Sequence, residues 1–105
     1  MSEIHFVERL RNQVLLDQQY RVWESGNWVV ARERAARLAS GGNRIYFHDS
    51  QASPSYLGGE IIGFRALTPD HPEKGRIIFI FKEDEEGAGI LAGDGGWRNE
   101  QKTNP

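Results

Sequence analysis

The sequence contains no cysteine, which excludes disulfide bonds, zinc or iron–sulfur sites with thiolate ligands, and a cysteine nucleophile. It has no run of 18 apolar residues, so no transmembrane helix is expected. The N-terminal stretch lacks the basic and apolar regions of a secretory signal. These absences predict a cytoplasmic protein, and a length of 105 residues predicts a single domain over residues 1–105.

A strong excess of one charge is also missing, since the formal net charge is −2. The balance is uneven along the chain. Residues 1–82 carry 11 Lys and Arg against 9 Asp and Glu, whereas residues 83–105 carry 2 against 6. This pattern allows a locally basic face, but strong non-specific binding to duplex nucleic acid is not expected.

The three histidines show none of the spacings that hold zinc. His5, His48 and His71 lie far apart, without an HxH, HxxxH or HExxH pattern. The glycines of residues 87–93 resemble a dinucleotide-binding loop only superficially, because too few residues follow them for a βαβ unit. We therefore expect no metal and no cofactor.

Two catalytic arrangements each lack a required feature. A metal-dependent nuclease built on Asp49 and Glu60 needs a lysine two positions after the glutamate, where Ile62 stands. The serines that follow His48 do not lie in a GxSxG nucleophile elbow. No catalytic residue is therefore assigned, and binding is expected rather than catalysis.

Apolar residues at helical spacing mark the N-terminus. Ile4, Val7, Leu10 and Val14 follow that spacing, which predicts an amphipathic N-terminal helix within residues 1–19. A short strand containing Trp28 comes next, and a second helix begins near Arg32 and ends at the glycine pair 41–42.

Period-two alternation marks the next strand, residues 44–48. Ile45 and Phe47 are expected to face the core, which leaves Arg44, Tyr46 and His48 together on the opposite face. A loop over residues 49–59 is expected to follow that strand.

Two further strands are predicted over residues 60–67 and 76–82, the latter apolar on both faces. Residues 83–96 are acidic and glycine-rich and are predicted to be a mobile connection, with a closing strand over residues 97–102. The whole order predicts an α+β fold: a small, mostly antiparallel β-barrel with an N-terminal helix and a short helix after the first barrel strand.

Aromatic and basic residues gather in the middle of the sequence. Unpaired bases are held by stacking on aromatic rings, while arginines contact the phosphates. Each such aromatic residue is more often a packing residue than a base platform. Tyr46 and His48, together with Arg44, are the best candidates because the alternation places all three on one face.

The segment of residues 27–64, NWVVARERAARLASGGNRIYFHDSQASPSYLGGEIIGF, resembles the opening of small PUA-like barrels, the superfamily that includes PUA, ASCH, EVE and YTH domains. The resemblance extends over residues 27–82 and implies binding of RNA or of a modified base in a cleft between barrel and helix. It implies a cleft lined by Asn27, Trp28, Tyr46, His48, Ser53 and Tyr56, with Arg32, Arg34 and Arg44 meeting the phosphates.

Two features depart from that family. Some ASCH relatives hydrolyse acylated nucleosides with a lysine, a threonine and a glutamate, but no lysine of this sequence lies obviously near Glu60 and a threonine. The expected N-terminal helix is also atypical. The missing lysine weighs against the enzymatic branch, whereas the helix is interpreted as an embellishment or an interaction element.

The resulting hypothesis is a nucleic-acid-binding domain that recognises single-stranded RNA or a modified or flipped base by stacking. One alternative is a small nucleoside or amide hydrolase that uses His48 and Glu60. Another is a protein-interaction module that docks through the N-terminal helix or the acidic run 83–86. No membrane partner is expected, and the oligomeric state stays open.

Overall fold

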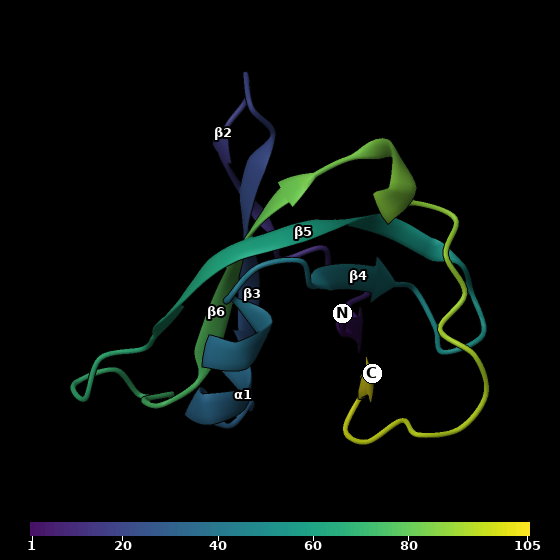
Figure 1. Ribbon diagram of the computed structural model, residues 1–105. Helices are drawn as coiled ribbons and strands as arrows, with labels where there is room; N and C mark the ends of the chain where they lie inside the picture. Colours follow the sequence, from purple (N-terminus) through teal and green to yellow (C-terminus); the bar gives the residue numbers. More distant parts are fainter.

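Seven strands form one sheet in the computed structural model, which describes residues 1–105 (Figure 1). In space their order is β2-β3-β6-β5-β4-β1-β7. One α-helix and one short 3₁₀ helix complete the fold. The elements are β1 (Glu3–Val7), β2 (Val14–Asp17), β3 (Val22–Trp28), α1 (Arg32–Leu38), β4 (Arg44–His48), β5 (Ser55–Ala66), β6 (Ile77–Glu83), η1 (Glu85–Gly87) and β7 (Gln101–Asn104).

The N-terminal strand β1 lies inside the sheet, between β4 and β7. It runs parallel to β4 and antiparallel to β7, while all other neighbouring strands are antiparallel. The two ends of the chain therefore lie side by side (Figure 1). At the other end of the sheet, the β2–β3 hairpin projects from the body.

The predicted N-terminal helix is wrong, because residues 1–19 form β1 and β2 instead. Alternation decides the outcome in β1: Ile4 and Phe6 enter the core, and His5 points to the other face of the sheet, where it is also buried. Two of the residues at helical spacing, Leu10 and Val14, are mostly exposed, so no apolar helical face exists.

The predicted barrel is also wrong. The sheet is open, since β2 and β7 are its two edges and do not pair with each other. Of the two N-terminal strands, β2 forms one edge of the sheet beside β3, and β1 lies inside the sheet between β4 and β7. The fold is therefore a small, mostly sheet domain with an open mixed sheet and one α-helix, rather than an α+β barrel with two.

Other predicted elements are confirmed, with shifted limits. Helix α1 begins at Arg32 and β4 spans the expected residues 44–48. Strand β5 begins at Ser55, inside the predicted loop, and β7 begins four residues later than the predicted closing strand.

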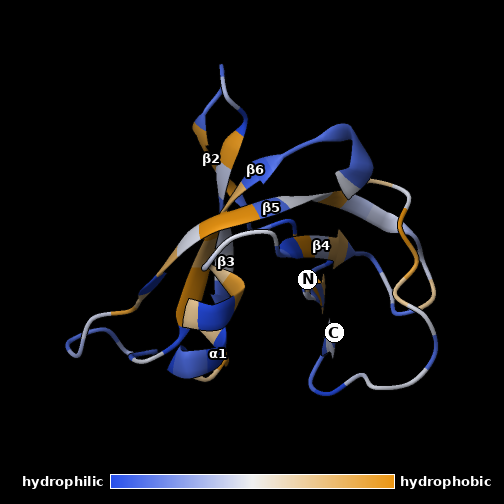
Figure 2. Ribbon diagram, in the orientation of Figure 1, coloured by the Kyte–Doolittle hydropathy of each residue, from blue (hydrophilic) through white to orange (hydrophobic).

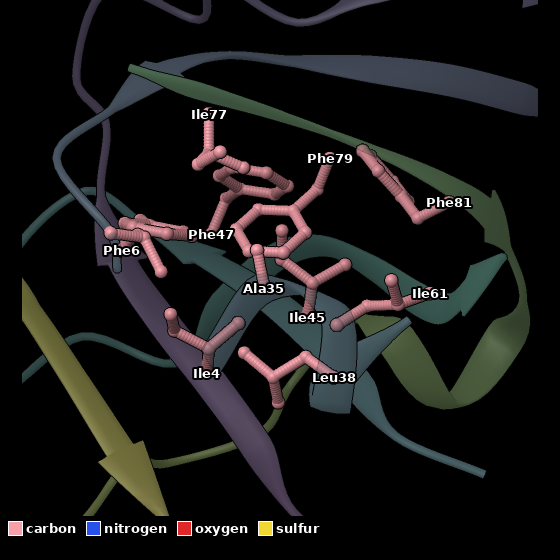
Figure 3. Close-up of a cluster of buried hydrophobic side chains, with 11 residues drawn as sticks. Ile4, Phe6, Ala35, Leu38, Ile45, Phe47, Ile61, Ile77, Phe79 and Phe81 are labelled. Carbon is pink, nitrogen blue, oxygen red and sulfur yellow. The ribbon is translucent and has the colours of Figure 1, made fainter. Parts of the chain in front are cut away.

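The core lies between α1 and the sheet. Four phenylalanines and several isoleucines from β1, β4, β5 and β6 pack there against the helix (Figure 3). Apolar colour accordingly concentrates on the inner strands, whereas the β5–β6 loop is hydrophilic (Figure 2). The buried members of the core are Ile4, Phe6, Val30, Ala35, Leu38, Ile45, Phe47, Ile61, Ile77, Phe79 and Phe81.

The opposite face of β1 and β4 is covered by residues 88–100, which form no regular element and which we call the cover. Trp97 of the cover lies edge-on to the rings of His5 and His48, at centroid distances of 6.5 and 5.9 Å. The cover therefore buries polar side chains on the face that alternation assigns away from the core.

No helix of this fold has the length and apolar character needed to cross a membrane.

The packing of the core predicts how much stability is lost when a buried side chain is shortened. We expect Phe47→Ala to lower the free energy of unfolding by about 3–5 kcal/mol, because the ring is fully buried and its loss leaves a cavity. Ile62→Ala, on the neighbouring strand but half exposed, is the control and should cost less than about 1 kcal/mol. Urea unfolding measures both, and equal losses would contradict this placement of the core.

Candidate nucleic-acid interface

The nine predicted site residues do not meet in one cleft. The structure places them in four environments: the buried face under the cover, the end of β3, the start of β5 with the loop before it, and helix α1. Each environment determines what its side chains can contact.

Arg44 already has a carboxylate partner inside the protein. Its guanidinium donates to both carboxylate oxygens of Asp84, at 2.9 and 2.6 Å, and to the hydroxyl of Tyr46 at 2.8 Å. Asp84 first, and Tyr46 second, raise the pKa of Arg44 against the opposing effect of burial. Its fork of donors is therefore occupied and not presented to a phosphate.

Tyr46 and His48 lie beneath the cover and are buried. Tyr46 stacks on His5, with ring centroids 4.9 Å apart and planes at 20°. His48 lies 2.8 Å from His5 through its Nε2 atom and 2.8 Å from the carbonyl of Ser53 through its Nδ1 atom. Neither ring presents a free face on which a base could stack.

Asn27 and Trp28 line a hollow of about 680 Å³ at the end of β3. Trp28 stacks on Phe6 of the core, with centroids 4.2 Å apart, and its buried Nε1 atom has no hydrogen-bond partner. The side-chain oxygen of Asn27 accepts a hydrogen bond from Arg76 at 3.3 Å. These two predicted residues are neighbours of one hollow, which the other seven do not line.

Ser53 lies in the loop before β5, and Tyr56 is the second residue of β5. The Ser53 amide donates to the Ser50 hydroxyl at 3.1 Å. The Tyr56 hydroxyl donates to the carbonyl of Glu8 at 2.6 Å, and the guanidinium of Arg11 lies 3.7 Å above its ring. Ser53 therefore holds the loop together, and Tyr56 ties the start of β5 to the segment after β1.

The remaining two predicted residues, Arg32 and Arg34, have no carboxylate partner, unlike most arginines of this protein. Six of the ten arginines pair with a carboxylate: Arg9, Arg11, Arg21, Arg44, Arg65 and Arg76. The four that do not are Arg32, Arg34 and Arg37 of α1 and Arg98 of the cover.

Two of these unpaired arginines, Arg34 and Arg98, line a cleft of about 330 Å³. Its cationic lining residues are Arg34, Arg98 and Lys102, and no carboxylate lines it. Arg34 also lines an adjoining hollow of about 210 Å³ together with Arg37. The two hollows share Arg34 and Thr103 and lie between α1 and β7. Together we call them the basic cleft.

The sequence reasoning included Arg32 and Arg34 but did not place Arg98 or Lys102 in the site. Arg98 lies 64 positions after Arg34 in the sequence. Only the pairing of β1 with β7 brings the end of the chain next to the helix. Arg37 was visible as a helical neighbour of Arg34, three residues along the same helix.

The hydrolase alternative needs His48 and Glu60 close together. The register of β4 and β5 pairs Glu60 with Arg44, at the opposite end of β4 from His48, and His48 is buried. No three His, Asp or Glu side chains gather in an arrangement that could hold a metal ion.

Comparisons with protein-family models, with curated proteins and with solved structures found no match. The resemblance to PUA-like domains therefore stays a prediction.

The structural role of Arg44 yields a prediction. We expect Arg44→Gln to lower the free energy of unfolding by about 1.5–3 kcal/mol, because it removes charge-assisted hydrogen bonds from a mostly buried side chain. Arg65→Gln, which breaks an exposed pair with Glu24, should cost less than about 1 kcal/mol. Chemical unfolding of both variants tests this, and a harmless Arg44→Gln would show that Arg44 is free for a ligand.

Proposed function

We propose that this protein binds single-stranded nucleic acid, with the phosphates of the strand held in the basic cleft. The observation that carries the proposal is that most arginines are paired with carboxylates, whereas those of the basic cleft are not. Six arginines elsewhere are paired with carboxylates. By contrast, Arg34 and Arg98 line one hollow, Arg34 and Arg37 line the adjoining one, and neither hollow has an acidic residue in its lining. Cationic side chains near one another without counter-charges favour an anionic ligand.

The hollowed shape supports a strand rather than a duplex. The cleft of about 330 Å³ has the size of a small-ligand site, so it suits one or two nucleotides of a flexible strand. The side chain of Val29, which also lines the cleft, is 68 % exposed and offers an apolar surface beside the arginines. The net charge of −2 gives no long-range attraction for a polyanion.

Stacking by Tyr46 and His48 is not part of this proposal, because both rings are buried. Trp28 and Asn27 stay candidates for contact with a base at the end of β3. The choice between RNA and DNA, the preference for a modified base and the cytoplasmic location stay predictions.

The alternative of a protein-interaction module relied on two docking elements, the N-terminal helix and the acidic run 83–86. The first is absent, because the N-terminal residues form strands. In the acidic run, Glu83 pairs with Arg21 and Asp84 pairs with Arg44. Two of its four carboxylates are therefore used within the protein. Nothing in this geometry favours that alternative over the basic cleft.

Salt dependence of binding tests the proposal. We expect a 12-nucleotide single-stranded RNA to bind, and its DNA counterpart serves as the second arm. In the variant Arg34→Gln/Arg37→Gln/Arg98→Gln, affinity should fall at least tenfold. The slope of log affinity against log salt should shrink by about 2, because roughly 0.7 counterions are released per phosphate contact on a single strand.

The matched control is the variant Arg9→Gln/Arg11→Gln/Arg65→Gln, which removes the same charge from paired, exposed arginines. It should lose much less affinity and keep most of the slope. Equal losses in both triple variants would mean that net charge alone governs binding, and no binding of either strand would overturn the proposed function.

A further inference from the structure

The hollow of about 680 Å³ at the end of β3 shares no lining residue with the basic cleft. We call it the β3 hollow. Its walls come from β3, from the segment after β1, and from the end of β5 and the start of β6 with the loop between them. Its volume lies in the range of small-ligand sites.

The cations of the β3 hollow are already paired. Arg65 pairs with Glu24 at 2.8 Å, and Arg76 pairs with Glu73 at 3.1 Å. The only other charged group in the lining is the carboxylate of Glu8, which forms no ion pair. The β3 hollow therefore disfavours a phosphate and favours a ligand group that donates hydrogen bonds.

The carboxylate of Glu8 is held in place and keeps a free oxygen. The Glu8 amide donates to the carbonyl of His48 at 2.9 Å, and the Glu8 carbonyl accepts from the hydroxyl of Tyr56 at 2.6 Å. Its Oε1 atom accepts from the amide of Leu10 at 2.9 Å and has a second lone pair. Its Oε2 atom makes no hydrogen bond within the protein and lies 4.0 Å from the place that a β-carbon of Gly26 would take. Glu8 thus offers two oxygens that can accept.

The end of β3 offers donors that have no acceptor. The buried Nε1 atom of Trp28 has no hydrogen-bond partner, although buried polar groups are nearly always hydrogen-bonded. An arginine can only donate, so the Asn27 side chain turns its oxygen to Arg76, at 3.3 Å, and its Nδ2 group stays without an acceptor. A ligand that complements the β3 hollow therefore brings an acceptor for β3 and donors for Glu8.

Guanine carries this combination on a single edge. Its O6 atom accepts, and its neighbouring N1–H and N2–H groups both donate, so one carboxylate can accept from both. Adenine and cytosine instead place one amino group beside a ring nitrogen that accepts, and uracil has one N–H group between two carbonyls. A carboxylate that faces any of those three edges meets an acceptor as well as a donor. Among the bases, guanine is therefore the best complement.

The β3 hollow and the basic cleft meet at consecutive residues. Trp28 lines the first and Val29 lines the second, and the Cα atoms of neighbouring residues are about 3.8 Å apart. The Gln101 side chain donates to the carbonyl of Val29 at 2.9 Å, which ties this segment to β7. A strand with its phosphates in the basic cleft can therefore place a base in the β3 hollow.

We propose that the β3 hollow recognises a guanine base of the bound strand. Glu8 accepts from the N1–H and N2–H groups of the base, and Asn27 and Trp28 supply the donors for its O6 atom. The inference rests on the proposed function, because the strand itself is held by the basic cleft. Base selection and phosphate binding then belong to different sets of residues.

Base preference is measured with two 12-nucleotide RNA strands that consist of uridine except for one central guanine or one central adenine. We expect the guanine strand to bind at least about fivefold more tightly, because a bidentate contact to a base discriminates by at least that factor. Both strands carry the same number of phosphates, so the ratio of their affinities does not report on the basic cleft. Equal binding of both strands would overturn guanine recognition and leave the proposed function intact.

Glu8→Gln separates base recognition from charge. It replaces one accepting oxygen by a donor, so the affinity ratio should fall below about twofold, although the loss of a negative charge favours binding of both polyanions. The matched control, Glu86→Gln, removes the same charge from an exposed residue of η1 and should keep the ratio. A ratio that stays fivefold in Glu8→Gln would overturn the proposal.

Asn27→Asp supplies a second variant if Glu8→Gln does not fold. The aspartate keeps an acceptor for Arg76 but loses the donor for O6. The ratio should fall at least twofold, whatever the added charge does to the affinity of both strands. An unchanged ratio in this variant would count against the proposal.

Guanosine monophosphate tests the β3 hollow without the strand. NMR gives one indole N–H signal for each tryptophan, and Trp28→Phe identifies the signal of Trp28. We expect that signal to shift with guanosine monophosphate much more than with adenosine monophosphate. Equal shifts, or none, would overturn guanine recognition. If neither RNA strand binds, the proposed function is overturned, and this titration decides the guanine site alone.

Discussion

The insertion of β1 between β4 and β7 is the interaction on which the rest of this structure depends. Its parallel register with β4 aligns Ile4 with Ile45 and Phe6 with Phe47, so the apolar residues of both strands enter one core. The same register sends His5 and Tyr46 to the other face. Its antiparallel register with β7 then brings the end of the chain beside α1.

This register also creates a second buried layer, on the face of β1 and β4 beneath the cover, and that layer is polar. Buried polar groups must be hydrogen-bonded, since an unpaired one costs about 1–3 kcal/mol. The chain from Glu3 through His5 and His48 to Ser53 meets that demand with contacts of 2.8 Å. This polar layer lies on one face of the sheet, whereas the core on the other face is apolar.

The separation of paired and unpaired arginines connects the fold to the proposed function. Pairing removes Arg44 from the candidate interface, although its position in the sequence beside Tyr46 made it a strong candidate. The cover adds Arg98 to Arg34, and β7 adds Lys102. The basic cleft is thus a product of chain topology, and its cationic residues come from α1, the cover and β7.

The sequence alone determined the elements whose signal is local. Helix α1 with its glycine ending, the alternation of β4 and the apolar strand β6 were all readable, because each depends on neighbouring residues. The N-terminal segment was misread because four apolar residues happened to match helical spacing, while sheet pairing on both sides of β1 overrode that preference. Burial of Tyr46 and His48, the partner of Arg44 and the meeting of Arg34 with Arg98 were decided only by the tertiary structure. Each of these depends on contacts between residues more than 30 positions apart, which no local pattern encodes.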